Sequence, residues 1–326
     1  MQEQIAINAA LIAVRQAAQF VCDRATLLLL LQAHGGVTRY ADFSLQTGLA
    51  SRLLSARLAQ MTQDGLLVRM PYSRRPLRHA YHLTHMGTAL FDVLALLTTW
   101  EQTWPDAATV NRQVQLVHAD CQATGKPQAT SVLAKAHCAA CDTPVSAREV
   151  TLHVSAKEMA RMPDKSTSTR RTSEAAGQRS ASNSALLPQA LAVLGDKWSI
   201  EVMVAAFFRT RQFGEFGTRL GISSNILTDR LTRLVNLGLL SRGVDDGVAR
   251  KGAYLLTPKG RDFYAVLIAI ESWADAWVDR RVRSPVKLRH IRCRNALQLR
   301  LKCGACGQPL NHANARLALT SAIPVI

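Results

Sequence analysis

The chain lacks a hydrophobic run long enough to cross a membrane. Near its start, the longest purely apolar run is Leu27–Leu31, whereas a membrane-spanning helix needs about 20 apolar residues. Asp23 and Arg24 interrupt the only segment that resembles the core of a signal peptide. We therefore expect a cytoplasmic protein without a membrane anchor.

Acidic residues are scarce. The 326 residues include 23 Asp and Glu against 40 Lys and Arg, which gives a formal net charge of +17 at pH 7. A surface this basic attracts polyanions, of which nucleic acid is the most common, although a ribosome-associated or merely basic protein has the same balance. Hydrophobic residues make up 48%, which excludes a wholly disordered chain, and the length is enough for about two domains.

Motifs of common enzyme classes are also missing. The sequence has no nucleophile elbow, phosphate-binding loop or HExxH motif, so we predict no catalytic residues and no enzymatic activity. The seven cysteines are an odd number. In a reducing compartment, clustered cysteines point to metal or redox chemistry more often than to disulfides.

The most informative feature is an internal repeat. When the chain is shifted by 173 positions, nine of the 23 residues from Thr47 to Arg69 are identical to their partners, and the offset holds without a gap from Ala17 to Trp104. Trp100 and Trp104 fall on Trp273 and Trp277. The chain is therefore predicted to contain two copies of one domain.

The second copy shows the clearer pattern. Its apolar spacing and turn residues predict helices 191–208, 213–220 and 224–236, strands 239–242 and 253–256, and a last helix 258–278. Ser223 or Ser224 is expected to cap the third helix, and Thr257 the last one. Leu227, Leu231 and Leu234 form one buried stripe. Two helices joined by a glycine turn and followed by a hairpin predict a winged helix-turn-helix.

These observations define the fold class: mainly α (α+β), with tandem winged helix-turn-helix domains, each followed by a small Cys/His ribbon-like hairpin. The expected divisions are winged-helix domain 1 (1–110), ribbon-like segment 1 (111–155), a flexible linker rich in Ser, Thr and Arg (156–188), winged-helix domain 2 (189–282) and ribbon-like segment 2 (283–326).

Five stretches of the second copy carry a family resemblance. The HxlR-type bacterial transcription regulators resemble this chain at Leu194–Ser199, Arg211–Phe216, Gly221–Leu231, Leu237–Arg242 and Tyr254–Gly260. The likeness covers about residues 190–277 and, more weakly, residues 17–104. The GDKW motif of the second copy, Gly195–Trp198, is replaced in the first copy by Cys22–Ala25, which has no tryptophan. The resemblance implies a winged-helix regulator that binds operator DNA and is usually dimeric through its terminal helices.

Candidate DNA contacts follow from how a winged helix docks on DNA. The start of the recognition helix meets base edges in the major groove, and the wing holds the backbone or the minor groove. We expect base contacts from Ser224, Asn225, Thr228 and Arg233 in the second copy and from Ser51, Arg52 and Ser55 in the first. Arg230 and Arg57 are expected to contact phosphates. The wing residues are Arg250, Lys251, Arg74, Arg75 and Arg78.

The tryptophan-bearing helices leave the assembly open. They form a natural surface on which the two copies pair as an intramolecular pseudo-dimer, but each copy can instead pair with a second chain, and the tryptophans can simply seal their own cores. Two functional alternatives also stay open, a winged-helix adaptor that binds protein and a Cys-x-x-Cys redox-responsive protein.

Each copy is followed by the same set of soft ligands. The first set is His118, Cys121, Cys138 and Cys141, and the second is His290, Cys293, Cys303 and Cys306. Two pairs with x-x spacing fit one tetrahedral zinc ion per copy, with a hairpin between the pairs absorbing their different separations. A zinc ion held by four protein ligands is structural. Reduced structural thiols or a Cys-x-x-Cys redox switch are the rival interpretations.

Overall fold

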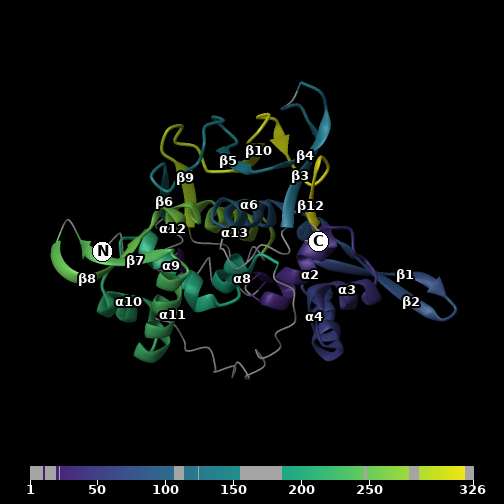
Figure 1. Cartoon of the computed structure of the whole chain (residues 1–326), viewed down its shortest axis with the longest axis horizontal. Coiled ribbons are helices and arrows are strands. Elements are labelled where there is room, and N and C mark those ends of the chain that lie inside the picture. The colour runs from purple at the N-terminus through teal and green to yellow at the C-terminus, as the bar shows by residue number, and fades with distance from the viewer. Residues whose placement is uncertain are drawn as a thin grey trace, which may run out of the picture.

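The computed structural model describes residues 10–11, 20–21, 23–105, 114–123, 125–154, 186–245, 248–278 and 286–319. Most of the predicted linker, residues 155–185, lies outside the described residues, as does Cys22. Figure 1 shows two winged-helix units on either side of a central helix pair, with a strand-rich layer along one side of that pair.

The first copy follows the predicted order of a winged helix. Its elements are α2 (Arg24–His34), α3 (Tyr40–Thr47), α4 (Ser51–Gln63), β1 (Leu67–Arg74), β2 (Leu77–Leu83), α5 (His85–Thr88) and α6 (Phe91–Thr103). Strands β1 and β2 form an antiparallel hairpin, which is the wing, and α4 is the recognition helix.

The second copy repeats this order. Its elements are α8 (Pro188–Leu194), α9 (Lys197–Phe207), α10 (Phe213–Leu220), α11 (Ser224–Asn236), β7 (Leu240–Asp245), β8 (Val248–Leu256), α12 (Pro258–Asp262) and α13 (Tyr264–Trp277). Leu227, Leu231 and Leu234 are fully buried, which confirms the predicted stripe.

Two predicted helices are each divided in the structure. The expected helix 191–208 ends at Leu194, and α9 starts again at Lys197 because the Asp196 side chain accepts a hydrogen bond from the Ser199 backbone amide. The predicted last helix is interrupted at Phe263. Thr257 caps α12 as predicted, but Ser223 begins α11 without a capping hydrogen bond from its side chain.

Both helix-turn-helix turns depend on a glycine. Gly48 and Gly221 have φ values of 62° and 63°, in the left-handed region that side-chain-bearing residues rarely adopt. Each turn places its recognition helix across the helix before it. The repeat of 173 residues therefore reappears as one backbone geometry used twice.

The two copies pack against each other through α6 and α13. The Trp100 indole donates to the Lys259 carbonyl at 3.0 Å, and the Trp273 indole donates to the Met86 carbonyl at 3.0 Å. Donors and acceptors are each related by the same offset of 173 residues, so the bonds are reciprocal. Apolar residues of both copies belong to one continuous core.

The strand layer is built from both copies. It contains β3 (Val114–Cys121), β4 (Gln128–Val132), β5 (Ala134–Cys138), β6 (Val150–Val154), β9 (Val286–His290), β10 (Leu299–Cys303), β11 (Pro309–Leu310) and β12 (Ala315–Leu319). Strand β3 pairs with β12, β6 with β9, and β5 with β10, so each of these three pairs joins the first copy to the second.

This pairing corrects one expectation. We predicted that residues 111–155 and 283–326 each fold into their own ribbon, but their strands are exchanged about the β5–β10 pair, where Ala136 faces Leu301. Reciprocal backbone bonds, from Ala139 to Gln298 and from Gly304 to Leu133, flank that pair. The two segments are alike, so a strand of one segment can pair with the strand of the other that matches its usual partner.

Among the residues that the structure describes, no helix is both long and apolar enough to cross a membrane.

Candidate nucleic-acid interface and metal clusters

The two recognition helices lie on one side of the molecule. In Figure 1, α4 and α11 both project from the lower edge, opposite the strand layer, and the two wings extend outward at the two ends. The α6–α13 contact holds the copies in this arrangement. One face of a single chain therefore presents two helices and two wings.

The predicted base-contacting side chains of α11 are accessible. Ser224, Asn225, Thr228 and Arg233 are all exposed, and the Thr228 hydroxyl donates to the Ser224 carbonyl at 2.8 Å. The helix also exposes Ile226, 38% accessible, on the same part of its surface. This end of α11 therefore offers polar and apolar groups together.

The corresponding start of α4 exposes two serines and one arginine. Ser51, Arg52 and Ser55 are exposed as predicted. The Tyr40 hydroxyl of α3 lies 3.1 Å from the Ser55 hydroxyl and donates to the Ser51 carbonyl. Tyr40 is therefore part of this surface, although a single aromatic residue at a helix start gives no distinctive signal in the sequence.

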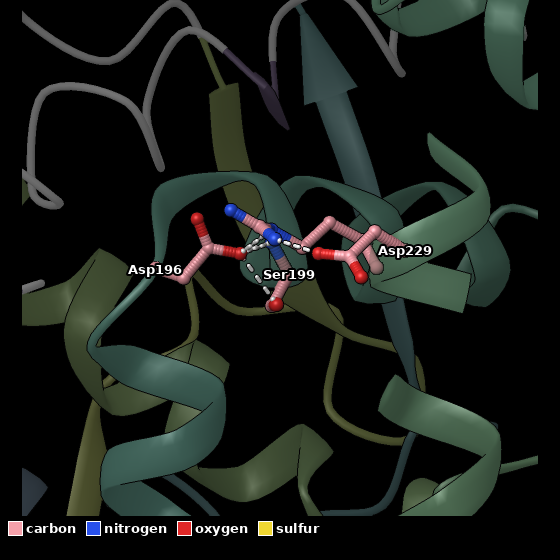
Figure 2. A network of polar contacts seen from close by, with 4 residues as sticks. Asp196, Ser199 and Asp229 are labelled. Carbon is pink, nitrogen blue, oxygen red and sulfur yellow. Dashed lines mark hydrogen bonds and ion pairs between the residues drawn. The ribbon is translucent and has the colours of Figure 1, made fainter. Parts of the chain in front are cut away.

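Arg230 is paired inside the protein. Its Nε lies 2.5 Å from the Asp196 carboxylate and its Nη1 2.6 Å from Asp229. The same Asp196 oxygen accepts from the Ser199 hydroxyl and backbone amide. Figure 2 shows Asp196, Ser199 and Asp229 gathered in this network. The arginine side chain is 19% exposed, so its main contacts are within the protein.

The first copy repeats the pair in a more open form. Arg57 lies 3.1 Å from Asp23, and both side chains are more than a third exposed. Asp23 caps α2 through the Thr26 amide, as Asp196 caps α9. In both copies an aspartate therefore joins the start of one helix to the recognition helix. We predicted the two arginines as phosphate contacts and overlooked the two aspartates, although their offset of 173 residues was a usable signal.

The wing of the first copy carries the exposed basic residues that were predicted. Arg74, Arg75 and Arg78 are all exposed at its tip. In the second wing, Arg250 and Lys251 lie in β8, but their side chains lie outside the described part of the chain. The described basic surface therefore includes one wing tip, Arg52 at the start of α4 and Arg233 in the last turn of α11.

The eight predicted metal ligands meet in two clusters. Cluster A is His118, Cys121, Cys303 and Cys306, and cluster B is Cys138, Cys141, His290 and Cys293; within each, the ligand atoms lie within 4.8 Å of one another. The predicted membership of the two sets is wrong, because each cluster takes one pair from each copy. Strand exchange brings β3 beside β12 and β6 beside β9, and the ligand pairs move with these strands.

Separations within the clusters suit a tetrahedral ion. Sulfur atoms are 3.9 Å apart in Cys121–Cys303 and 3.8 Å apart in Cys138–Cys293. Zinc–sulfur bonds of about 2.3 Å at the tetrahedral angle place two sulfurs about 3.8 Å apart. His290 Nδ1 lies 3.2 Å from Cys141 Sγ, and His118 Nδ1 lies 3.6 Å from Cys306 Sγ. The imidazoles therefore face the sulfurs.

The Cys-x-x-Cys turns share one backbone form. Asp142 and Gly307, each following the second cysteine, have φ values of 59° and 74°. A hydrogen bond from the Thr143 hydroxyl lowers the pKa of Cys141 to about 6, whereas burial raises the pKa of Cys138. Cys306 matches Cys141, because backbone amides of Gln308 and Gln122 outweigh burial and lower its pKa to about 6.

Comparison with known proteins gives consistent results. The family model for the HxlR-like helix-turn-helix matches residues 20–109 and 193–282. An HTH-type transcriptional regulator of Mycobacterium tuberculosis is 35% identical over 126 residues, 39% of this chain and 80% of the relative. A Synechocystis regulator is 34% identical over 88 residues, which cover 27% of this chain and 65% of the regulator's length. The match to the solved structure of PA1607, described as a putative transcription factor, covers 40% of this chain and 93% of the PA1607 chain, at 32% identity and a TM-score of 0.36.

Proposed function

The chain belongs to the HxlR-like helix-turn-helix family and is a DNA-binding transcription regulator, and from this premise we propose that it binds its operator as an intramolecular pseudo-dimer. The observation that carries the proposal is the common face on which α4 and α11 lie (Figure 1). Two recognition helices on one face fit successive major grooves of one duplex, as they do in dimeric helix-turn-helix proteins. A regulator of transcription acts on the chromosome, so we place it in the cytoplasm.

Residues at the start of each recognition helix would read bases. Asn225 suits adenine through paired hydrogen bonds, with Ser224 and Thr228 beside it. Arg233 lies in the last turn of α11 and would reach guanine farther along the groove. Arg52, Ser51 and Ser55 occupy the same position in α4. Because the two sets differ, the pseudo-dimer would prefer an operator with two unlike half-sites, whereas a symmetric dimer requires two equal ones.

The remaining basic residues would supply affinity. The wing arginines Arg74, Arg75 and Arg78, together with Arg250 and Lys251, would contact phosphates or the minor groove. Arg230 and Arg57 would act mainly as positioning residues, because their aspartate partners already orient them along the recognition helix.

Binding to a promoter fragment tests the assignment. The duplex upstream of the regulator's own reading frame is compared with a shuffled duplex of equal length at several salt concentrations. We expect preference for the promoter and a steep fall in affinity with added salt, since each phosphate contact contributes about −0.9 to the logarithmic slope. Equal, weak binding to both duplexes would contradict the proposal and favour a protein-binding adaptor.

A matched pair of variants assigns the face. Asn225→Ala removes a base-reading group, and Asn236→Ala alters the same residue type at the far end of the same helix. We expect the first to weaken promoter binding with little effect on the shuffled duplex, and the second to leave both unchanged. An equal effect of the two variants would mean that α11 does not enter the groove by its first turn.

We also propose that clusters A and B each hold one structural zinc ion. The support is the donor set of three thiols and one imidazole, which suits zinc, and the sulfur separations near 3.8 Å. Zinc would join strands that come from different copies, so its role would be to fix the exchanged strand layer. With four protein ligands it would have no open position for a substrate.

A further inference from the structure

A cavity of about 360 Å³ lies between the second winged helix and the strand pair β6–β9. Its wall is mainly apolar and includes Phe207, Phe208, Tyr264, Leu267, Ile268 and Leu288. The volume falls within the range of about 300–1,000 Å³ that is typical of small-molecule sites. Neither DNA contacts nor the metal clusters use these side chains.

The equivalent place in the first copy is filled. There α2 packs against β12, and Leu31, Leu94 and Leu317 are between 1% and 4% exposed. Gly35 lies close beneath that strand, since a β-carbon built on it would meet the Leu317 carbonyl oxygen at 3.6 Å. The fold therefore does not require a cavity at this position.

The cavity wall differs between the copies at the end of the second helix. The residue that corresponds to Gly35 at the offset of 173 is Phe208, which lines the cavity. The second copy therefore has a benzyl group in the wall where the first copy has a hydrogen atom. The cavity is thus a feature of the second copy alone among the two described winged helices.

Polar groups accompany the opening. Glu271 and Tyr264 line the cavity where the first copy has Thr98 and Phe91. Glu271 is only 9% exposed and lies two helical turns after Tyr264 on α13, so both side chains face the same cavity. Burial and the negative charge of Glu271 raise the pKa of Tyr264. The Phe207 and Tyr264 rings are 5.0 Å apart.

The charge of the wall points to one ligand class. Among the described lining residues, Glu271 is acidic and none is Lys, Arg or His. A carboxylate forms strong charge-assisted hydrogen bonds with an ammonium group, and aromatic faces attract cations. The apolar remainder suits a ring system of matching size.

We propose that this cavity is a binding site for a small aromatic amine, with the ring against Phe207 and Tyr264 and the ammonium group at the Glu271 carboxylate. Helix α9, which supplies Phe207, packs against α11. Occupancy would therefore act on the recognition helix, a consequence that rests on the proposed DNA-binding function, whereas the binding site itself does not.

Calorimetry on the full chain without DNA tests the site directly, so a failure of DNA binding does not affect the result. The probes are 1-naphthylmethylamine, 1-naphthylmethanol and 1-naphthoate at pH 7, which share a ring and differ in charge. We expect the amine to bind at least tenfold more tightly than the alcohol and the carboxylate not to bind. Comparable binding of amine and carboxylate, or no binding of any probe at 1 mM, would overturn the proposal.

Two variants locate the ligand. Glu271→Gln should lower amine affinity about tenfold and leave alcohol affinity unchanged, whereas Asp92→Asn, which changes a carboxylate on α6 of the first copy, should alter neither. Val150→Trp should fill the cavity and abolish binding of both, with circular dichroism confirming the fold. Unchanged amine affinity in Glu271→Gln, or in a folded Val150→Trp protein, would contradict the assignment.

Discussion

The two winged helices of this chain keep the same backbone and differ in what they expose. Both use a glycine turn near φ 62° and both reach across α6–α13 with one tryptophan. At the start of the recognition helix, however, Asn225 and Thr228 in one copy correspond to Arg52 and Ser55 in the other. The residues that build the fold are repeated, and most of the residues that face outward from the recognition helices are not.

The comparison also holds at the helix caps. Asp196 is 7% exposed and its pair with Arg230 is largely covered, whereas Asp23 and Arg57 are more than a third exposed. The same two positions therefore form a largely buried ion pair in the second copy and a surface ion pair in the first. Equal residues at equal positions need not contribute equally to stability.

The largest expected effect concerns metal content. Cys121→Ser with Cys303→Ser changes two ligands of cluster A, while Cys121→Ser with Cys138→Ser changes one ligand in each cluster. If zinc binds across the copies, the first double variant should keep about one zinc per chain and the second should keep none. Metal analysis by mass spectrometry gives the counts, and wild-type protein should hold two.

Unfolding measurements extend that test. Structural zinc in small domains contributes on the order of 10 kcal/mol of apparent binding energy, so the second double variant should be the less stable of the two. If instead the Cys121/Cys138 double variant loses only one zinc and is the more stable of the two, each ligand set must come from a single copy.

The aspartate pair gives the next largest effect. Asp196→Asn removes the buried carboxylate partner of Arg230 and leaves only Asp229, which is 73% exposed; breaking a buried ion pair costs about 3–5 kcal/mol. Asp23→Asn opens a surface pair, for which about 0–1 kcal/mol is usual. Urea unfolding of both variants measures the difference. Equal destabilisation would mean that the two networks are buried to a similar degree in solution.

Base reading should separate the two recognition helices. We expect Asn225→Ala to reduce discrimination at one half-site by about 1–3 kcal/mol, and Arg52→Ala to do so only at the other. Binding to operator fragments substituted at one base pair at a time measures each effect. If both variants weaken the same positions, the helices do not read separate half-sites.

The smallest effect is a dependence on pH confined to the first copy. Burial lowers the pKa of His34 from 6.5 to about 4, while the matching residue of the second copy is Phe207, which does not titrate. Because the folded pKa lies below the unfolded one, stability is complete above pH 6.5 and falls as the pH drops toward 4. One pH unit below 6.5, the loss is about 1.4 kcal/mol.

His34→Gln checks that dependence, since an amide can still donate to the Gly87 carbonyl that His34 contacts at 3.1 Å. The difference in unfolding free energy between pH 7.5 and 5.5 should shrink by that amount in the variant. If the difference in unfolding free energy between the two pH values is the same in the variant and the wild-type protein, groups other than His34 cause the acid sensitivity.

Much of the fold could be predicted from local patterns. The glycine turn, the stripe of Leu227, Leu231 and Leu234, and the Thr257 cap are set by residues close in sequence, and the structure confirms each. The division at Asp196 was missed because an apolar period runs through it, although a capping side chain outweighs that period. The recognition residues of the first copy could also be placed on the surface, since their polar character repeats at helical spacing, and its wing arginines could be placed there because they cluster in a hairpin turn.

The sequence by itself determined that this chain holds two winged helices and eight candidate metal ligands, because repeats, caps and x-x spacings are local properties. Only the tertiary structure decided which side chains meet. Two similar ribbon segments can pair within a copy or between copies with the same local contacts, and the packing of α6 on α13 brings the segments together so that they exchange. The wall of the cavity beside Phe208 has the same origin, since part of it is β6, a strand contributed by the first copy.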